Sequence, residues 1–192
     1  MLRAAKFRLY PTPEQEKFLW GQWGAVRFVW NKALALKKRY WKREGRSLSP
    51  IHDLKPLIAR AKQSKKYEWL KLYDSMALQE SLRHLDAAFK RFSKKQAGYP
   101  HWKSRRGEQT SYHCTCVSVG DGWIRVPKVG RIKAVTHRPV EGKIKSITLS
   151  VDTTGAYYAS VLYEDGQAQA QPPVKIYEDE VVGFDLVLKD LV

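Results

Sequence analysis

Polar and hydrophobic residues alternate at the start of the chain. Over Ala4–Tyr10 every second residue is apolar, at Ala5, Phe7 and Leu9. A period of two predicts a half-buried β-strand. No other strand pattern adjoins it, so we expect this strand to pair with strands from later in the chain.

The pattern then changes to helical spacing. Thr12–Gln15 combines a capping hydroxyl, a proline at the first helical position and a glutamine three residues after the cap. We expect one helix over residues 13–22. After the pair at 23–24, apolar residues at 3.6 spacing predict a second helix over residues 26–43, which Gly45 ends.

Two further helices are expected before residue 100. Ser49-Pro50 can start a third helix, which Pro56 must kink or shift. Asp74 or Ser75 caps a fourth helix that runs to about Phe92 with one apolar face. Together the four helices can form a small bundle.

From Ser111 onward the chain shows short alternating segments separated by glycine-containing turns, which predict a small antiparallel β-barrel that the first strand joins. A polar linker at 165–173 leads to a last apolar strand at 180–186, which carries Asp185. The predicted barrel strands are Tyr112–Val119, Trp123–Val126, Arg131–Val135, Ile144–Val151 and Tyr157–Tyr163.

The chain is basic, and the excess charge is concentrated. Its 192 residues include 35 Lys and Arg and 19 Asp and Glu. Residues 26–106 hold 22 of the basic and 6 of the acidic residues, so the remainder is balanced at 13 of each. Aromatic residues interleave with this charge at 37–43 and 99–106. The segment therefore favours binding to nucleic-acid phosphates over the alternative of a solvated lysine-rich helix face.

Other chemistry is less well supported. Cys114 and Cys116 would share one face of a strand from which His113 points away, which leaves two ligands where zinc needs four. We expect small buried side chains there. The sequence has no secretion signal and no apolar stretch near the roughly 20 residues of a membrane span. We expect a cytoplasmic, nucleoid-associated protein without disulfides.

Six motifs in order resemble one family. They lie at 7–15, 27–34, 77–92, 98–104, 126–133 and 181–191, and include FRLYPTPEQ, RFVWNKAL and GYPHWKS. The set resembles the N-terminal half of the TnpB (OrfB) family of transposon-encoded RNA-guided nucleases. The helical pair over Pro13–Arg43 fits the helix-turn-helix by which such transposases have been described.

The resemblance implies an α+β fold with four parts. Residues 1–10 would be the first strand of a wedge-like barrel, and residues 11–108 a helical recognition lobe inserted in it. Residues 109–175 would complete the barrel. Residues 176–192 would begin an incomplete RuvC nuclease domain of the RNase H-like kind.

The resemblance also implies one candidate nuclease carboxylate. Asp185 in GFDLVLKD matches the family's first RuvC carboxylate, although Val187 replaces the usual glycine. RuvC cleavage uses two Mg²⁺ ions held by several carboxylates. The family's later carboxylates and its zinc element have no counterpart here. We therefore expect an incomplete metal site, no bound Mg²⁺ and no nuclease activity of this chain alone.

The remaining candidates would bind guide RNA and double-stranded target DNA. Gln79 matches a glutamine of the family's ALQ motif and can pair with adenine, or it can be an ordinary surface glutamine. Tyr112, beside Ser111, can face a duplex or belong to the barrel core. The candidate phosphate contacts are Lys37, Arg39, Lys42, Arg43, Arg83, Lys90, Arg91, Lys103, Arg105 and Arg106.

Three functions therefore stay open. The first is a truncated, nucleic-acid-binding TnpB-like protein of a mobile element. The second is a fragment or half of an active Mg²⁺-dependent RNA-guided endonuclease. The third is a cleavage-dead, RNA-guided repressor.

Overall fold

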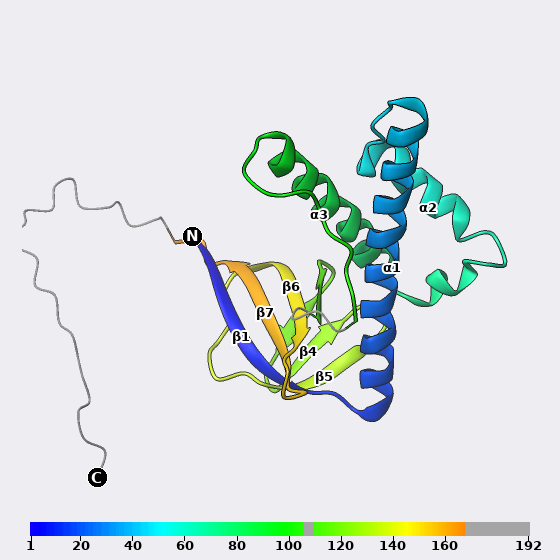
Figure 1. The fold of residues 1–192 in the computed structure, drawn as a ribbon. Coiled ribbons are helices and arrows are strands. Elements are labelled where there is room, and N and C mark those ends of the chain that lie inside the picture. Colours follow the sequence, from blue (N-terminus) through cyan, green and yellow to red (C-terminus); the bar gives the residue numbers. More distant parts are fainter. Residues whose placement is uncertain (106–109, 168–192) are drawn as a thin grey trace, which may run out of the picture.

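A computed structural model of the chain describes residues 1–105 and 110–167. The described strands form one antiparallel sheet, and the helices gather on one side of it (Figure 1). The strands are β1 (Leu2–Tyr10), β2 (Thr110–Cys114), β3 (Ser118–Gly120), β4 (Trp123–Val126), β5 (Gly130–Val135), β6 (Lys143–Val151) and β7 (Tyr157–Glu164). The helical block lies between β1 and β2 in the chain, as expected from the sequence.

The first strand lies at the centre of the sheet. The strand order is β2-β6-β7-β1-β5-β4-β3, and β1 pairs with β7 on one side and β5 on the other. Its alternate residues Ala5, Phe7 and Leu9 are buried. Both the predicted strand and its pairing with strands from later in the chain are confirmed, because its apolar positions face the core that those strands also cover.

The sheet curls strongly but stays open. A flat sheet of seven strands would separate its edges by about 29 Å. The edge strands are β2 and β3, and only residues 115–117 connect them. This link spans at most about 14 Å, so the sheet must curl to bring its two edges that close together. No ladder pairs β2 with β3, so these described strands do not close the predicted barrel. The predicted strand over Tyr112–Val119 is split by this link.

One long helix replaces the two that the sequence predicted. α1 (Pro13–Glu44) begins with the expected capping box: the Gln15 amide donates to Thr12 Oγ1 over 3.4 Å, and the Thr12 amide to Gln15 Oε1 over 3.0 Å. It ends at Gly45, whose φ is 62°. The predicted break at 23–24 is wrong. The buried Trp23 ring stacks on the ring of Tyr157, with centroids 6.1 Å apart, and this packing offsets the roughly 1 kcal/mol that a helical glycine costs.

The other helices follow the expected caps. The sequence did not predict the 3₁₀ turn η2 (Glu68–Leu72), which lies between α2 (Lys55–Ala61) and α3 (Ser75–Ser93). Pro56 lies in the first turn of α2, so it shifts the helix start as expected. Asp74 caps α3, where Oδ1 accepts from the Met76 amide over 2.9 Å. The segments are a π-helical turn η1 (Pro50–Leu54), α2 (Lys55–Ala61), η2 (Glu68–Leu72) and α3 (Ser75–Ser93).

Two buried hydrogen bonds fix α3 against α1. The Gln22 side chain, fully buried, accepts from the Asp74 amide over 2.8 Å. The Ser81 hydroxyl donates to the carbonyl of Val26 over 3.1 Å. α1 therefore holds both the start and the middle of α3. None of the described helices is long and apolar enough to cross a bilayer.

Candidate nucleic-acid interface

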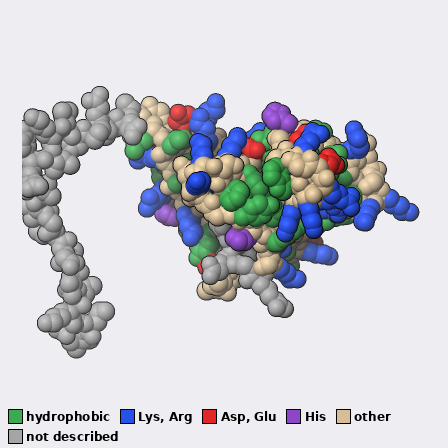
Figure 2. Space-filling model, turned by 45° about the horizontal axis from the view of Figure 1, so that its top comes forward, with side chains coloured by type: hydrophobic (Ala, Val, Ile, Leu, Met, Phe, Trp, Pro, Cys, Tyr) green, Lys and Arg blue, Asp and Glu red, His purple; other side chains and the backbone are tan. Residues whose placement is uncertain are grey.

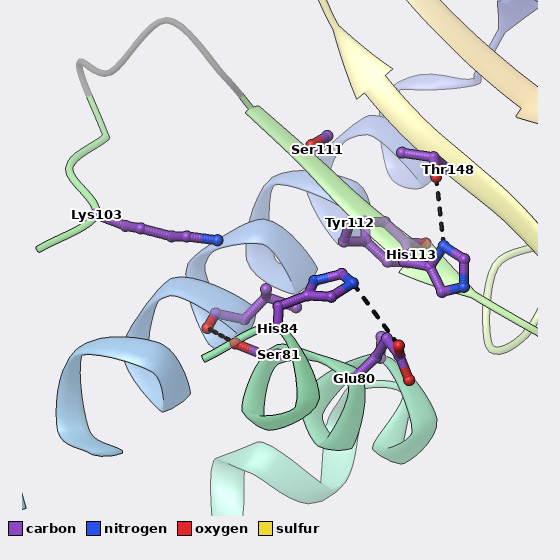
Figure 3. A pocket seen from close by; sticks show the side chains of 10 residues that line it. Glu80, Ser81, His84, Lys103, Ser111, Tyr112, His113 and Thr148 are labelled. Atoms are coloured by element: carbon purple, nitrogen blue, oxygen red, sulfur yellow. Dashed lines mark hydrogen bonds and ion pairs between the residues drawn. The ribbon is translucent and has the colours of Figure 1, made fainter. Parts of the chain in front are cut away.

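A polar cavity of about 260 Å³ lies where the helices meet the edge strand β2 (Figure 3). It brings together three of the residues predicted from sequence, namely Lys103, Ser111 and Tyr112. Lys103 comes from the chain segment after α3, and the other two come from β2. The remaining walls are formed by α1, α3, β6 and a third residue of β2, through Val26, Ala77, Glu80, Ser81, His84, Thr148 and His113.

The Lys103 side chain is held in place by α1. The Asn31 amide group donates to the Lys103 carbonyl over 2.9 Å and accepts from the Lys103 amide over 2.9 Å. Trp30 Nε1 donates to the carbonyl of His101 over 3.0 Å. Lys103 Nζ then lies 4.2 Å from the centroid of the Trp30 ring. Trp30 and Asn31 lie in the motif RFVWNKAL, but their spacing alone does not predict that they position this segment.

Lys103 belongs to a group of three cations on this side of α1, which we call the Arg27 cluster: Arg27, Lys103 and Arg105. Burial and the neighbouring Arg27 lower the pKa of Lys103. Burial and the neighbouring Arg105 lower the pKa of Arg27. Among the described residues no carboxylate forms an ion pair with any of the three. The cluster thus carries unneutralised positive charge, which a phosphate group would stabilise.

Two histidines form another wall of the cavity. The rings of His84 and His113 meet edge to face with centroids 6.0 Å apart. His84 Nε2 lies 3.7 Å from Glu80 Oε1, and His113 Nδ1 lies 3.4 Å from the Thr148 hydroxyl (Figure 3). Burial lowers the pKa of His84, Glu80 opposes that shift, and His113 and Lys103 add to it. We therefore expect a neutral His84 near pH 7.

Tyr112 is a core residue. Its side chain is 3% exposed, and its ring packs edge to face with Trp23, centroids 6.4 Å apart. Of the two sequence interpretations, the structure supports the core one. The Tyr112 hydroxyl is buried beside the cavity without a hydrogen-bond partner among the described residues, and burial raises its pKa well above the usual value.

Two predicted contacts lie away from the cavity. Lys37 is buried, and its ammonium donates to the Ser47 hydroxyl and the Leu48 carbonyl over 2.6 Å each. Its prediction as a phosphate contact is therefore wrong, because those bonds and the Phe89 ring, 4.5 Å away, already hold the charge. Gln79 is half-buried and lines a separate groove of about 240 Å³ between α2 and α3.

The other predicted cations divide into paired and free groups. Arg83 pairs with Glu80 over 3.1 Å and Lys90 with Asp86 over 2.8 Å, so both are partly neutralised. Figure 2 shows Lys and Arg side chains spread over the visible face, with few Asp and Glu. Arg106 and Asp185 lie outside the described residues. Four exposed cations at the ends of α1 and α3 form no ion pair within the described chain: Arg39, Lys42, Arg43 and Arg91.

The cysteines do not share a face. Cys114 ends β2 and is buried, whereas Cys116 follows the strand and is exposed. The expectation of two buried thiols holds only for Cys114, because the strand ends there. Among the described residues, no group of three or more His, Cys, Asp or Glu side chains could hold a metal ion.

Known proteins match most of this chain. The virulence protein VsdF of Salmonella dublin is 48% identical over 116 residues, which are 56% of this chain and 98% of VsdF. Two longer proteins match 85% of this chain: a "Putative RNA-guided DNA endonuclease" of Streptomyces pristinaespiralis at 33% identity, and the protein named "Putative RNA-guided DNA endonuclease InsQ" of Escherichia coli (strain K12) at 31%. The chain spans 42% and 40% of their lengths. The OrfB/IS605 family model described as "Helix-turn-helix domain" matches residues 1–46.

The chain belongs to the TnpB (OrfB) family. The family resemblance inferred from the six motifs is thereby confirmed. The region that the helix-turn-helix model matches has a different geometry, since residues 1–46 form β1 and a single helix α1. The predicted helical pair over Pro13–Arg43 is wrong, because α1 continues without a break through residues 23–24.

Proposed function

We propose that residues 1–167 of this TnpB-family chain are a nucleic-acid-binding module that holds guide RNA and double-stranded target DNA. The observation that carries the proposal is the Arg27 cluster. Three cations lie together, two of them with pKa values lowered by burial and by a neighbouring cation of the cluster, and the described residues give them no acidic partner. A phosphate backbone supplies the missing negative charge.

The cavity adds hydrogen-bond donors to that charge. Lys103 extends over it from the segment that α1 holds in place, and Ser111 lines it from β2. A phosphate at its mouth would accept bonds from these groups while the Arg27 cluster neutralises the strand. Contacts of this kind set the position of a nucleic acid and leave sequence choice to base pairing with a guide.

The four free cations at the ends of α1 and α3 would extend the same contact. They project into solvent and have no ion pair within the described chain, so their binding to phosphates costs no existing bridge. Gln79 stays a candidate for a base contact from the groove between α2 and α3, at one side of this surface.

We propose binding without cleavage for the described module. Its described residues provide no group of three or more carboxylate, histidine or cysteine ligands of the kind that metal-dependent cleavage requires. The role of Asp185 as a RuvC carboxylate stays a prediction. Incubation of the purified chain with Mg²⁺, a cognate guide RNA and a target duplex tests this point, and robust cleavage of the duplex would contradict it.

The binding proposal is tested with a 20-bp duplex and matched variants. Lys103→Gln together with Arg105→Gln should weaken duplex binding. It should also reduce the magnitude of the slope of log K against log salt by about 2, because each lost phosphate contact removes about 0.9. The control, Lys17→Gln with Lys71→Gln, removes two exposed charges elsewhere and should bind like the wild type. Equal affinities for both double variants would refute the assignment of phosphate binding to the Arg27 cluster.

A further inference from the structure

The strands of the sheet carry many cations and almost no acids. Outside residues 26–106 the chain has 13 basic and 13 acidic residues, which suggests neutrality. In the structure, Glu164 is the only acid within the seven described strands, and it pairs with Lys145 over 2.6 Å. The strands hold eight cations: Arg3, Lys6, Arg8, Arg125, Arg131, Lys133, Lys143 and Lys145.

The register gathers five of these cations and three aromatic residues on one face. Directly opposed residues of antiparallel strands point to the same face. Arg8 lies opposite Tyr158, Tyr10 opposite Lys133, and Lys133 opposite Trp123. Arg125 lies opposite Arg131, and Lys6 is two residues before Arg8 on β1. The alternate residues of these strands are buried, so this is the outer face of the sheet.

We call this surface the outer basic face: Lys6, Arg8, Tyr10, Trp123, Arg125, Arg131, Lys133 and Tyr158. Along the strands it extends from the position of Lys6 to that of Arg131, six residues or about 20 Å at 3.4 Å per residue. All five of its cations and Tyr10 are exposed, and the other two aromatic side chains are half-buried. These cations and Tyr10 are therefore accessible to a binding partner, as far as the described residues are concerned.

Three cations of this face lie over its aromatic rings. The Arg131 guanidinium lies 4.4 Å from the centroid of the Trp123 ring. Gly120 permits this arrangement, because a Cβ there would lie 2.7 Å from Trp123 Nε1. Arg8 lies 5.2 Å from the Tyr158 ring and donates to its hydroxyl over 2.9 Å, while Lys6 Nζ lies 4.2 Å from the same ring. Guanidinium and ring planes fixed in this way are the platforms on which unpaired bases stack.

We propose that the outer basic face binds a single strand of nucleic acid, separately from the Arg27 cluster. Bases would stack on the exposed ring of Tyr10 and on the Arg131–Trp123 and Arg8–Tyr158 pairs, while Lys6, Arg125 and Lys133 contact phosphates. A duplex keeps its bases stacked internally and cannot use the rings of this face. The aromatic groups therefore favour an unpaired strand, of RNA or of DNA, over a duplex.

The test compares three probes: a 12-nucleotide oligo-uridylate, a 12-nucleotide oligo-deoxythymidylate and a 20-bp DNA duplex, measured by fluorescence anisotropy at low salt. Tyr10→Ala with Arg131→Gln changes two exposed side chains and should leave the far-ultraviolet circular dichroism unchanged. It should weaken binding of both single strands by about five-fold or more, since the loss of one stacked base alone costs at least about that factor. Duplex binding should change less than two-fold.

The reciprocal variant, Lys103→Gln with Arg105→Gln, should weaken duplex binding and leave single-strand binding within two-fold. Unchanged single-strand affinity in Tyr10→Ala/Arg131→Gln would overturn the proposal. An equal loss of affinity for all three probes would also overturn it, because it would indicate one shared surface.

Competition by polyglutamate as strong as that by an oligonucleotide of equal charge would instead assign the face to an acidic protein. Because failure on this face leaves the duplex result intact, it is distinguishable from failure of the proposed function. Tighter binding of RNA than DNA supports the proposal and identifies a role for the 2′-hydroxyl.

Discussion

Replacement of Gly24 by alanine tests whether α1 is one continuous helix. Gly24 lies in the middle of α1, and a Cβ built on it meets no atom within 4 Å. Alanine in a helix interior is more stable than glycine by about 0.5–1 kcal/mol. Gly24→Ala should therefore raise the free energy of unfolding by that amount, and the melting temperature by about 1–4 °C for a chain of this size. Urea denaturation followed by circular dichroism measures the change.

Gly21 is the matched control on the same helix. A Cβ at Gly21 would lie 2.7 Å from Cε1 and 2.8 Å from Cζ of Tyr73, whose ring packs on Phe18 and Trp69. Displacing that ring costs about 1–3 kcal/mol, which outweighs the helical gain. Gly21→Ala should thus be less stable than Gly24→Ala. If Gly24→Ala destabilises the protein, a turn at 23–24 exists and the single helix is refuted.

Further predictions concern the buried lysine, the thiols and the N-terminus. Lys37→Met should destabilise the fold by about 1–3 kcal/mol, because it leaves buried acceptors unpaired, and it should not alter the salt slope of nucleic-acid binding. Lys42→Met should reduce that slope by about 1 and leave the free energy of unfolding unchanged. A loss of salt slope with Lys37→Met would contradict the buried position of this lysine. A thiol reagent at pH 8 should modify Cys116 rapidly and spare Cys114, whose pKa burial raises to about 12; two fast thiols per folded chain would be inconsistent with the structure. The pKa of Asp165 is lowered to about 2, chiefly by its hydrogen bond from the N-terminal ammonium. The ionised carboxylate therefore contributes fully to the stability of the fold above about pH 4, and this contribution should be lost as the pH falls toward 2. Asp165→Asn should remove that part of the acid sensitivity, and identical acid unfolding of the two proteins would exclude it.

Local signals predicted most of the elements correctly. The capping box at Thr12, the glycine stop at Gly45 and the Asp74 cap lie in the structure where the sequence placed them, because each depends on residues within one helical turn. The alternating strands were found for the same reason. Their order in the sheet, and the separation of β2 from β3, depend on pairings between distant residues that alternation does not encode.

Tertiary packing decided the features that the sequence could not predict. The stacking of Trp23 on Tyr157 carries α1 through the glycine at position 24. The burial of Lys37 depends on a loop ten residues later that supplies its acceptors. The position of Lys103 depends on Asn31, 72 residues away. A count of charges by segment likewise missed the outer basic face, because strand register separates its cations from the acids in turns and in α1.

The salt dependence of nucleic-acid binding by the wild-type chain tests the central claim most directly. Association with a 20-bp duplex, and with guide-length RNA, should be measured from about 50 to 300 mM salt. Four free cations and the three of the Arg27 cluster predict tight binding at low salt and, for the duplex, a slope of log K against log salt of about −6. Absence of binding to either polymer at low salt, or a flat salt response, would contradict the account.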